Sequence, residues 1–258
     1  MQYPTLLVDV KDGIAFLTLN RPDKRNALNA EARKDLMACL NAMRDDGAVR
    51  VVVVTGGGKA FAAGADIDEM AARSLWEQRQ FITPPHIYDA VSKYPKPVIA
   101  AINGFALGAG CELAMACDYR LAAAGAKLGQ PEINLGIIPG GGGTQRLPRL
   151  VGTGRAARLL FTGELIDAET AERWGLVDEV VAPEGLLGRA EELARKMAEK
   201  SPLALKLAKE ALRAAEELPL RESLAREIDL FSMAFASEDK REGIAAFKEN
   251  RKPVWTGR

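Results

Sequence analysis

The sequence predicts an α/β protein that is followed by a helical C-terminal region. As far as about residue 183, short apolar stretches typical of buried strands alternate with stretches of helical period. Such alternation is typical of an α/β fold. Beyond Pro183, only amphipathic helical patterns are evident. We therefore divide the chain into a core, residues 1–183, and a helical region, residues 184–258.

The N-terminal twenty residues predict a β-hairpin. The stretches 5–10 and 14–20 are rich in strand-forming residues, and Lys11-Asp12-Gly13 between them has the composition of a tight turn. After a break at Pro22, we expect a helix from about Ala30 to near Gly47. Asn29 is a suitable N-cap for this helix.

Two fully apolar stretches, residues 49–54 and 97–102, predict strands that are buried on both faces. Residues 66–94 lie between them and predict a charged, helical excursion from the core. A helix over about 109–117 and strand-like stretches near 119–122 and 176–181 complete the core.

The C-terminal region predicts three amphipathic helices at about 184–199, 202–216 and 219–236. Ser201-Pro202 supplies an N-cap and a proline at the first helical position. A fourth, short helix is expected from Ser237. We expect these helices to cover the core and to contact other subunits.

Composition excludes several classes of protein. The 35 Lys and Arg residues balance the 35 Asp and Glu residues, so the basic excess of a typical nucleic-acid binder is missing. An apolar share of 48% argues against disorder. There is no apolar run of the roughly 18 residues that a membrane span needs, and no signal peptide is evident. We expect a cytoplasmic protein that binds neither nucleic acid nor membranes.

The cysteines and the single histidine argue against a metal site. Cys39, Cys111 and Cys117 form no C-x-x-C pair, which makes a disulfide framework or zinc cluster improbable and predicts small, buried side chains. A catalytic triad would depend on His86 alone, and the chain has no G-x-S-x-G motif. We interpret His86 as a loop or packing residue.

Three segments rich in small residues indicate a ligand site: residues 60–67, 103–112 and 129–146. Small residues let the backbone approach a ligand closely, although the first segment taken alone could equally be a tightly packed loop. The second segment opens a helix, whose free N–H groups can bind an anion or an oxyanion. Glu112 in that apolar helix is costly to bury without a function or a partner. The alternative is a solvated or ion-paired Glu112 at the rim of the sheet.

The third segment places Glu132 in another apolar neighbourhood. Its four glycines, Gly140 to Gly143, lead into a helix for which Thr144 is a candidate cap, or else form a flexible turn. Neither glycine-rich segment fits a nucleotide motif. Gly108-x-Gly110 lacks the third glycine of a dinucleotide fingerprint and lies mid-chain, and the glycine run lacks the G-K-[ST] ending of a P-loop.

Taken together, in this order and spacing, the segments resemble the enoyl-CoA hydratase/isomerase family, also called the crotonase superfamily. The resemblance runs from Leu19-Asn20-Arg21-Pro22 to Phe247–Lys252. It implies a crotonase-like spiral of ββα turns over residues 1–183, which would hold a CoA-thioester site. It also implies that residues 184–258 build a homotrimer, commonly paired into a homohexamer. The substrate would be an acyl-CoA thioester, with no cofactor beyond its CoA and no metal.

The resemblance also assigns the reacting groups. The oxyanion hole maps to the backbone N–H groups of Ala65 and Ala109; relatives commonly have glycine at the second position, but a backbone donor should tolerate the methyl group. Hydratases carry two glutamates, which map to Glu112 and Glu132, whereas isomerases typically keep only the second. We assign Glu132 to proton transfer at C2 and Glu112 to activation of the water.

Contacts to CoA and to the thioester would come from residues that the family motifs place around the site, although each charged one could also be a solvated surface residue. These are Lys24, Arg25, Ala63, Asp66, Ile67, Asp68, Gly108, Gly140 and Lys248, the last from a neighbouring subunit or its own. Asp68 stands where relatives often have lysine. The acyl pocket would depend on residues 70–95, where four candidates either line it or pack the excursion onto the core: Trp76, Phe81, Ile82 and Tyr88.

The sequence therefore predicts a 2-enoyl-CoA hydratase, a lyase of fatty-acid β-oxidation. An enoyl-CoA isomerase or a specialised hydroxyacyl-CoA dehydratase on the same scaffold is the alternative. A non-catalytic, RNA-binding member of the family is more remote, because the chain has zero net charge and no aromatic-basic face.

Overall fold

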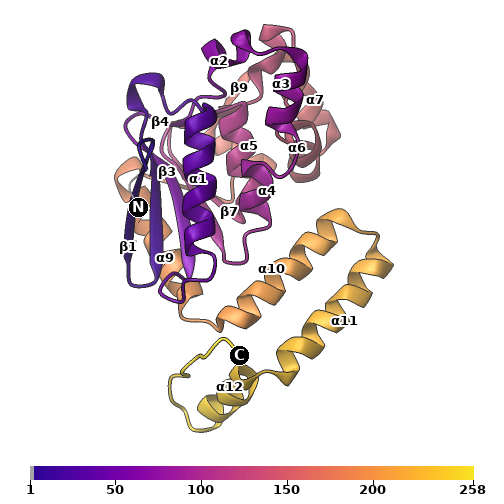
Figure 1. The fold of residues 1–258 in the computed structure, drawn as a ribbon. Coiled ribbons are helices and arrows are strands. Elements are labelled where there is room, and N and C mark those ends of the chain that lie inside the picture. Colours follow the sequence, from indigo (N-terminus) through magenta and orange to yellow (C-terminus); the bar gives the residue numbers. More distant parts are fainter. Residues whose placement is uncertain (1–2) are drawn as a thin grey trace.

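In the computed structural model, which describes residues 3–258, two β-sheets form the centre of the core (Figure 1). The larger sheet has six strands in the order β1 (Leu6–Lys11), β2 (Ile14–Leu19), β3 (Val51–Gly56), β5 (Val98–Ile102), β7 (Tyr119–Ala123) and β10 (Glu179–Val181). The smaller sheet has four strands in the order β4 (Ala60–Ala62), β6 (Phe105–Leu107), β8 (Lys127–Gly129) and β9 (Leu165–Asp167).

The predicted hairpin is confirmed. β1 and β2 pair antiparallel, with Leu6 opposite Leu19 and Lys11 opposite Ile14. Asp12 and Gly13 both have positive φ, of 51° and 80°, as a two-residue turn between twisted strands requires. The other strands of the larger sheet pair parallel to their neighbours.

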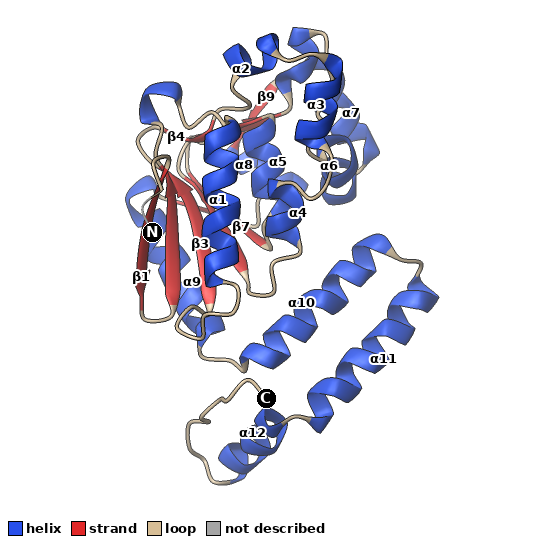
Figure 2. Cartoon of the chain, in the orientation of Figure 1, coloured by secondary structure: helices blue, strands red, loops and turns tan. Residues whose placement is uncertain are grey.

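Helices cover both faces of the larger sheet, as the fully apolar strands predict (Figure 2). Along β3, Val52 and Val54 pack into the main core with α1 (Ala30–Met43), α4 (Ile87–Ser92) and α5 (Ala109–Ala116). The alternate residues Val51 and Val53 pack against α9 (Leu186–Ala198) on the other face. Since strand side chains alternate between faces, a strand covered on both sides must be apolar throughout.

Helix α1 begins where the sequence places its cap. The Asn29 side chain accepts a hydrogen bond from the Ala32 N–H at 2.9 Å, and α1 ends at Met43. The predicted excursion contains α2 (Ile67–Ala72), α3 (Leu75–Ile82) and α4, and His86 is the N-cap of α4, in keeping with a packing role. The remaining helices of the core are η1 (Pro22–Lys24), η2 (Pro131–Leu135), α6 (Gly143–Val151), α7 (Thr153–Thr162), α8 (Ala168–Trp174) and η3 (Pro183–Gly185).

The smaller sheet brings the three glycine-containing segments together, and the sequence did not predict it. β4 and β6 lie in the first two segments, and β8 leads into the third. β4 pairs with β6, and β6 with β8, all parallel. Gly110 permits this arrangement, because a Cβ atom there would lie 1.9 Å from the Ala62 carbonyl oxygen. The start of α5 is therefore packed directly against the end of β4.

The C-terminal helices α10 (Pro202–Glu217), α11 (Leu220–Ala236) and α12 (Glu238–Lys248) project from the core (Figure 1). Asp118 fastens α10, since its carboxylate accepts from Lys209 at 2.7 Å and from Arg213 at 2.8 Å. α9 lies beyond residue 183 but packs on the larger sheet, and the division at that residue stays a prediction. Among residues 3–258, no helix is long and apolar enough to cross a membrane.

Candidate active site

A cavity of about 660 Å³ lies where the three segments meet the helical excursion. Eight of the residues predicted for the site line this cavity. They are Ala63, Ala65, Ile67, Gly108, Ala109, Glu112, Glu132 and Gly140. The smaller sheet thus assembles in one place residues that are widely separated along the chain.

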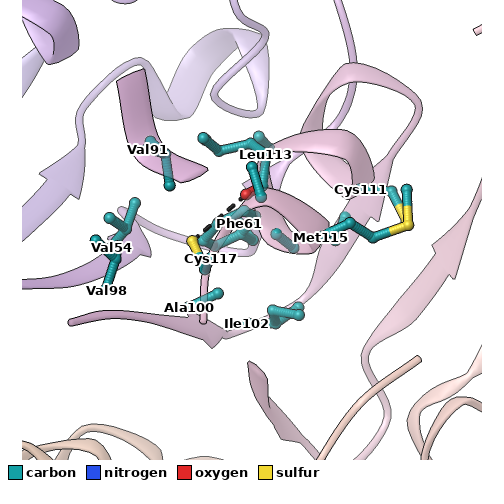
Figure 3. Packing of buried hydrophobic residues seen from close by; sticks show 14 of the residues in the cluster. Val54, Phe61, Val91, Val98, Ala100, Ile102, Cys111, Leu113, Met115 and Cys117 are labelled. Atoms are coloured by element: carbon teal, nitrogen blue, oxygen red, sulfur yellow. Dashed lines mark hydrogen bonds between the residues drawn. The ribbon is translucent and has the colours of Figure 1, made fainter. Parts of the chain in front are cut away.

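Helix α5 positions Glu112. All eight of its residues are buried, and Glu112 is the one charged side chain among them. Leu113 and Met115 pack with Phe61 and with strand residues such as Ile102 (Figure 3). Each large apolar side chain buried in this way contributes about 1.5–3 kcal/mol. This packing fixes the rotation of α5 and leaves Glu112 facing the cavity.

The Glu112 carboxylate is held by the glycine run. Its Oε1 accepts hydrogen bonds from the N–H groups of Gly141 at 2.7 Å and Gly143 at 2.8 Å. Burial raises the pKa of Glu112, and the two N–H donors oppose part of that rise. Its Oε2 accepts no hydrogen bond within residues 3–258, so this oxygen is available to a water or a substrate.

The expected cap at Thr144 is wrong. Helix α6 already begins at Gly143, and its N-cap is Gly142, which has no side chain that could cap the helix. The first free N–H of the helix instead donates to Glu112. The Glu112 carboxylate, which belongs to α5, thus accepts a hydrogen bond from the N-terminal N–H of α6. Thr144 is the second residue of α6 and does not cap it.

Glu132 lies on the short helix η2, directly after β8, and packs over Gly108. A Cβ atom on Gly108 would lie 2.7 Å from Glu132 Oε1, and Gly108 has a φ of 48°. The pKa of Glu132 is raised to about 7, mainly by burial and also by the charge of Glu112, while a hydrogen bond from its own backbone N–H opposes part of the rise. Gln130 is fully buried beside this carboxylate. With its amide nitrogen turned toward Glu132, it donates to both oxygens at 3.2 Å.

Two backbone N–H groups border the cavity beside these acids. Ala109 is the first residue of α5, so its N–H has no partner within the helix. Ala65 is bridged to Leu28, whose N–H donates to the Gly64 carbonyl at 2.8 Å. Neither the Ala65 nor the Ala109 N–H has a hydrogen-bond partner in the described part of the chain. Both are available to a ligand carbonyl.

The charged residues predicted to contact CoA are not among those that line the cavity. Lys24 and Asp68 form an exposed ion pair at 3.4 Å. Asp66 pairs with Arg21 at 3.0 Å and caps α2, and only the backbone of Arg25 contacts the site, through its bond with the Ala63 N–H. Lys248 is the last residue of α12. Their contacts with CoA stay predictions.

The structure separates the four candidates for the acyl pocket. Ile82 and Tyr88 line the cavity. Trp76 is 69% exposed, and the Phe81 ring packs under the Arg73 guanidinium at 3.6 Å. Trp76 and Phe81 are therefore not wall residues of this cavity.

Several lining residues were missed by the sequence analysis, and Arg33 is the most informative of them. Met70, Gln78, Leu135, Ile137 and Ile138 are among the others. Arg33 precedes Leu36 and Leu40 by three and seven residues on α1, so it lies on the buried face of that helix. A charged residue on an otherwise apolar face was a signal that could have identified it.

No cluster of three metal-binding side chains occurs within residues 3–258.

Comparison with known proteins decides the family. The sequence model of the enoyl-CoA hydratase/isomerase family matches residues 9–258. This chain belongs to that family. The predicted crotonase-like fold is confirmed by the relatives that share it.

Members of the enoyl-CoA hydratase/isomerase family resemble this chain over nearly its whole length. It is 45% identical to a crotonyl-CoA hydratase of Syntrophomonas wolfei, over 98% of both chains. It is 46% identical to a 2,3-dehydroadipyl-CoA hydratase of Escherichia coli, over 98% of this chain and 99% of the relative. An enoyl-CoA hydratase structure from Bacillus anthracis superposes with a TM-score of 0.93 at 41% identity, covering 98% of this chain and 100% of the other.

Proposed function

We propose that this protein is an enoyl-CoA hydratase, a hydro-lyase that adds water reversibly across the 2,3 double bond of a 2-enoyl-CoA to give a 3-hydroxyacyl-CoA. One observation carries the proposal: two buried carboxyl groups, Glu112 and Glu132, line one cavity with the free N–H groups of Ala65 and Ala109. The relatives named as hydratases support the same reaction.

The thioester carbonyl would accept hydrogen bonds from the Ala65 and Ala109 N–H groups. Negative charge builds on this oxygen when a nucleophile attacks C3, and donors already in place stabilise that charge. Removing one such donor costs about 10²–10³ in rate. The N–H of Ala109 also stands at the positive end of the α5 dipole.

The two glutamates divide the proton transfers. Glu112, with Oε1 fixed and Oε2 free, accepts a proton from the attacking water as its hydroxyl bonds to C3. Glu132, whose pKa is raised to about 7, retains a proton near neutral pH and delivers it to C2. A proton then passes from Glu112 to Glu132 and resets the pair. The two groups titrate as a coupled pair.

Crotonyl-CoA hydration tests this proposal. The loss of conjugated thioester absorbance is followed for the unmodified protein, for Glu112→Gln and for Glu132→Gln. Each substitution should lower kcat about 10²–10⁴-fold, whereas the exposed Glu31→Gln serves as the matched control and should match the unmodified protein. Absence of turnover by the unmodified protein on crotonyl and longer 2-enoyl thioesters would contradict the hydratase proposal.

The alternatives on this scaffold make different demands on the two acids. An enoyl-CoA isomerase would need only Glu132, so its activity would survive Glu112→Gln. A hydroxyacyl-CoA dehydratase would use both acids and differ in its acyl pocket. Product analysis of the Glu112→Gln protein, with 3-enoyl and 2-enoyl thioesters supplied separately, distinguishes the isomerase.

We also propose a homotrimer, paired into a homohexamer, that is held together by the C-terminal helices. A stripe of apolar side chains on α11 supports it: Leu224, Ile228, Phe231 and Phe235 are each about half exposed or more. Their spacing of three and four residues places them on one face of α11. Light scattering should give a mass three or six times that of one chain. A cytoplasmic location, a role in β-oxidation and the absence of any cofactor beyond CoA are further predictions.

A further inference from the structure

A buried guanidinium that forms no salt bridge within residues 3–258 lines the cavity. Arg33 is 8% exposed, and it lies on the same face of α1 as Leu36 and Leu40, which are fully buried. The proposed hydration chemistry, with its two glutamates and two N–H donors, assigns neither a proton transfer nor a hydrogen bond to this guanidinium. Its presence on an otherwise apolar helix face calls for a function.

Arg33 has no directly paired carboxylate, although its charge opposes part of the rise in the pKa of Glu112 and its side chain is hydrogen-bonded to Tyr88. Its Nε donates to the Leu28 carbonyl at 3.2 Å, and its guanidinium carbon lies 4.6 Å from the centre of the Phe81 ring and 5.4 Å from that of Tyr88. Within residues 3–258, Arg33 forms no salt bridge. Contacts with aromatic rings, a carbonyl and the Tyr88 side chain do not replace a paired carboxylate. The carboxylate whose charge reaches Arg33, that of Glu112, is held by the N–H groups of the glycine run.

Arg120 shows how this chain compensates a buried arginine elsewhere. Arg120 is 7% exposed, and it forms a salt bridge to Asp178 at 3.0 Å. Its Nε donates to the Leu176 carbonyl at 2.8 Å, and its Nη1 to the Cys117 carbonyl at 3.3 Å. Arg33 has the same degree of burial but lacks the carboxylate. Arg33 instead lines the cavity.

Arg33 lies among the residues expected at the acyl end of the substrate. Of the two rings that it contacts, Tyr88 lines the cavity, whereas Phe81 belongs to the same excursion but is not a wall residue. Tyr88 is next to the glutamate pair, because a Cβ atom on Gly141 would meet both the Tyr88 ring and Glu112 Oε2, at 2.1 and 2.6 Å. A chain that passes the glutamates toward Tyr88 therefore approaches Arg33.

We propose that the cavity accepts a 2-enoyl-CoA whose acyl chain ends in a carboxylate, and that Arg33 binds this carboxylate. A guanidinium presents paired N–H donors that match the two oxygens of a carboxylate. In a water-poor cavity, that pair would be stronger than at the surface. The inference rests on the proposed hydratase function, and it names Arg33 as the residue that selects the substrate class.

The test compares trans-2-hexenedioyl-CoA with trans-2-hexenoyl-CoA, which have equal chain lengths and differ in the terminal carboxylate. The ratio of their kcat/KM values should favour the diacid in the unmodified protein. In Arg33→Leu, this ratio should fall about 10–100-fold, which is the effect of losing a hydrogen-bonded charge pair. Arg33→Lys keeps the charge without the paired donors, so its ratio should lie between the two.

Lys34→Leu is the matched control. Lys34 is the exposed neighbour of Arg33 on α1, so its loss changes the net charge equally but leaves the cavity untouched. Its ratio should equal that of the unmodified protein. Thermal unfolding checks each variant, and if Arg33→Leu does not fold, the ratio of Arg33→Lys decides.

The possible results separate this inference from the proposed function. If hexenoyl-CoA is hydrated but Arg33→Leu leaves the ratio unchanged, the carboxylate site is wrong and the hydratase stands. If Arg33→Leu lowers both rates equally, Arg33 acts through Tyr88 or Glu112, and the inference fails. If neither thioester is hydrated, the proposed function fails first. Calorimetric binding of adipoyl-CoA against hexanoyl-CoA then tests Arg33 without any turnover.

Discussion

Replacing Gly108 by alanine should strongly lower the activity of the enzyme, although both glutamates remain in the chain. Gly108 has a φ of 48° and a ψ of −120°, a conformation that residues with a Cβ atom rarely adopt. The added methyl carbon would lie 2.7 Å from Glu132 Oε1 and 3.2 Å from its Cδ. Contacts this short cannot persist, so the carboxyl group must move away from α5.

The size of the effect follows from this displacement. A shift of about 1 Å in a reacting group costs on the order of 10² in rate, so kcat should fall about 100-fold. The backbone strain at Gly108 should cost about 1–3 kcal/mol of folding free energy. For a chain of this size, each kcal/mol lowers Tm by about 2–4 °C. The protein should therefore remain folded at 25 °C while it loses activity.

Gly125→Ala separates strain from displacement. Gly125 also has a positive φ, of 85°, but a Cβ atom there would meet nothing within 4 Å, and the residue is exposed. This variant should lose stability and keep its kcat. Crotonyl-CoA hydration and thermal unfolding are measured for both variants. A Gly108→Ala protein with the unmodified kcat would refute the placement of Glu132 against Gly108.

Three further predictions concern the stability and assembly of the protein. Burial raises the pKa of Glu132 from 4.5 to about 7, so its ionisation disfavours the folded state, and stability is lost as pH rises through that interval. Glu132→Gln should therefore raise Tm at about pH 8, and the gain should vanish below about pH 4.5; a constant gain would contradict this. Asp118→Ala should cost about 3–5 kcal/mol, because it leaves Lys209 buried without its partner. Hydrogen exchange in α10 should rise, and an unchanged rate would show that Asp118 does not fasten it. Phe231→Glu on α11 should reduce the mass seen by light scattering to one chain, and an intact oligomer would place the interface elsewhere.

Local sequence patterns were sufficient for the elements whose signals are strong and contiguous. The apolar run of β3 predicts a strand covered on both faces, and Val51 to Val54 all have zero exposure. Asn29 marks the start of α1, and Ser237 marks the start of α12, where its side chain accepts from the Lys240 N–H. In each case, the information lies within about ten residues of the element itself.

The smaller sheet could not be predicted in this way. Its strands have three residues each, which is too short for an alternation of apolar and polar residues to be recognised. β4, β6 and β8 exist because they pair with one another over long sequence separations. The family resemblance identified the site residues, because the family motifs mark the segments that this pairing brings together. Arg33 lies outside the motifs that carry the family resemblance, and only the folded chain shows that it lines the cavity.

The arrangement of the two acids explains why the glycines lie where they do. Glu112 is carried by α5, but Gly141 and Gly143, which hold its Oε1, follow Glu132 in the third segment. Glu132 is carried by η2, but it packs against Gly108, which precedes α5. Each acid is thus positioned by the backbone of the segment that carries the other. A movement of either segment would displace both carboxyl groups together, so their relative position does not depend on flexible side chains.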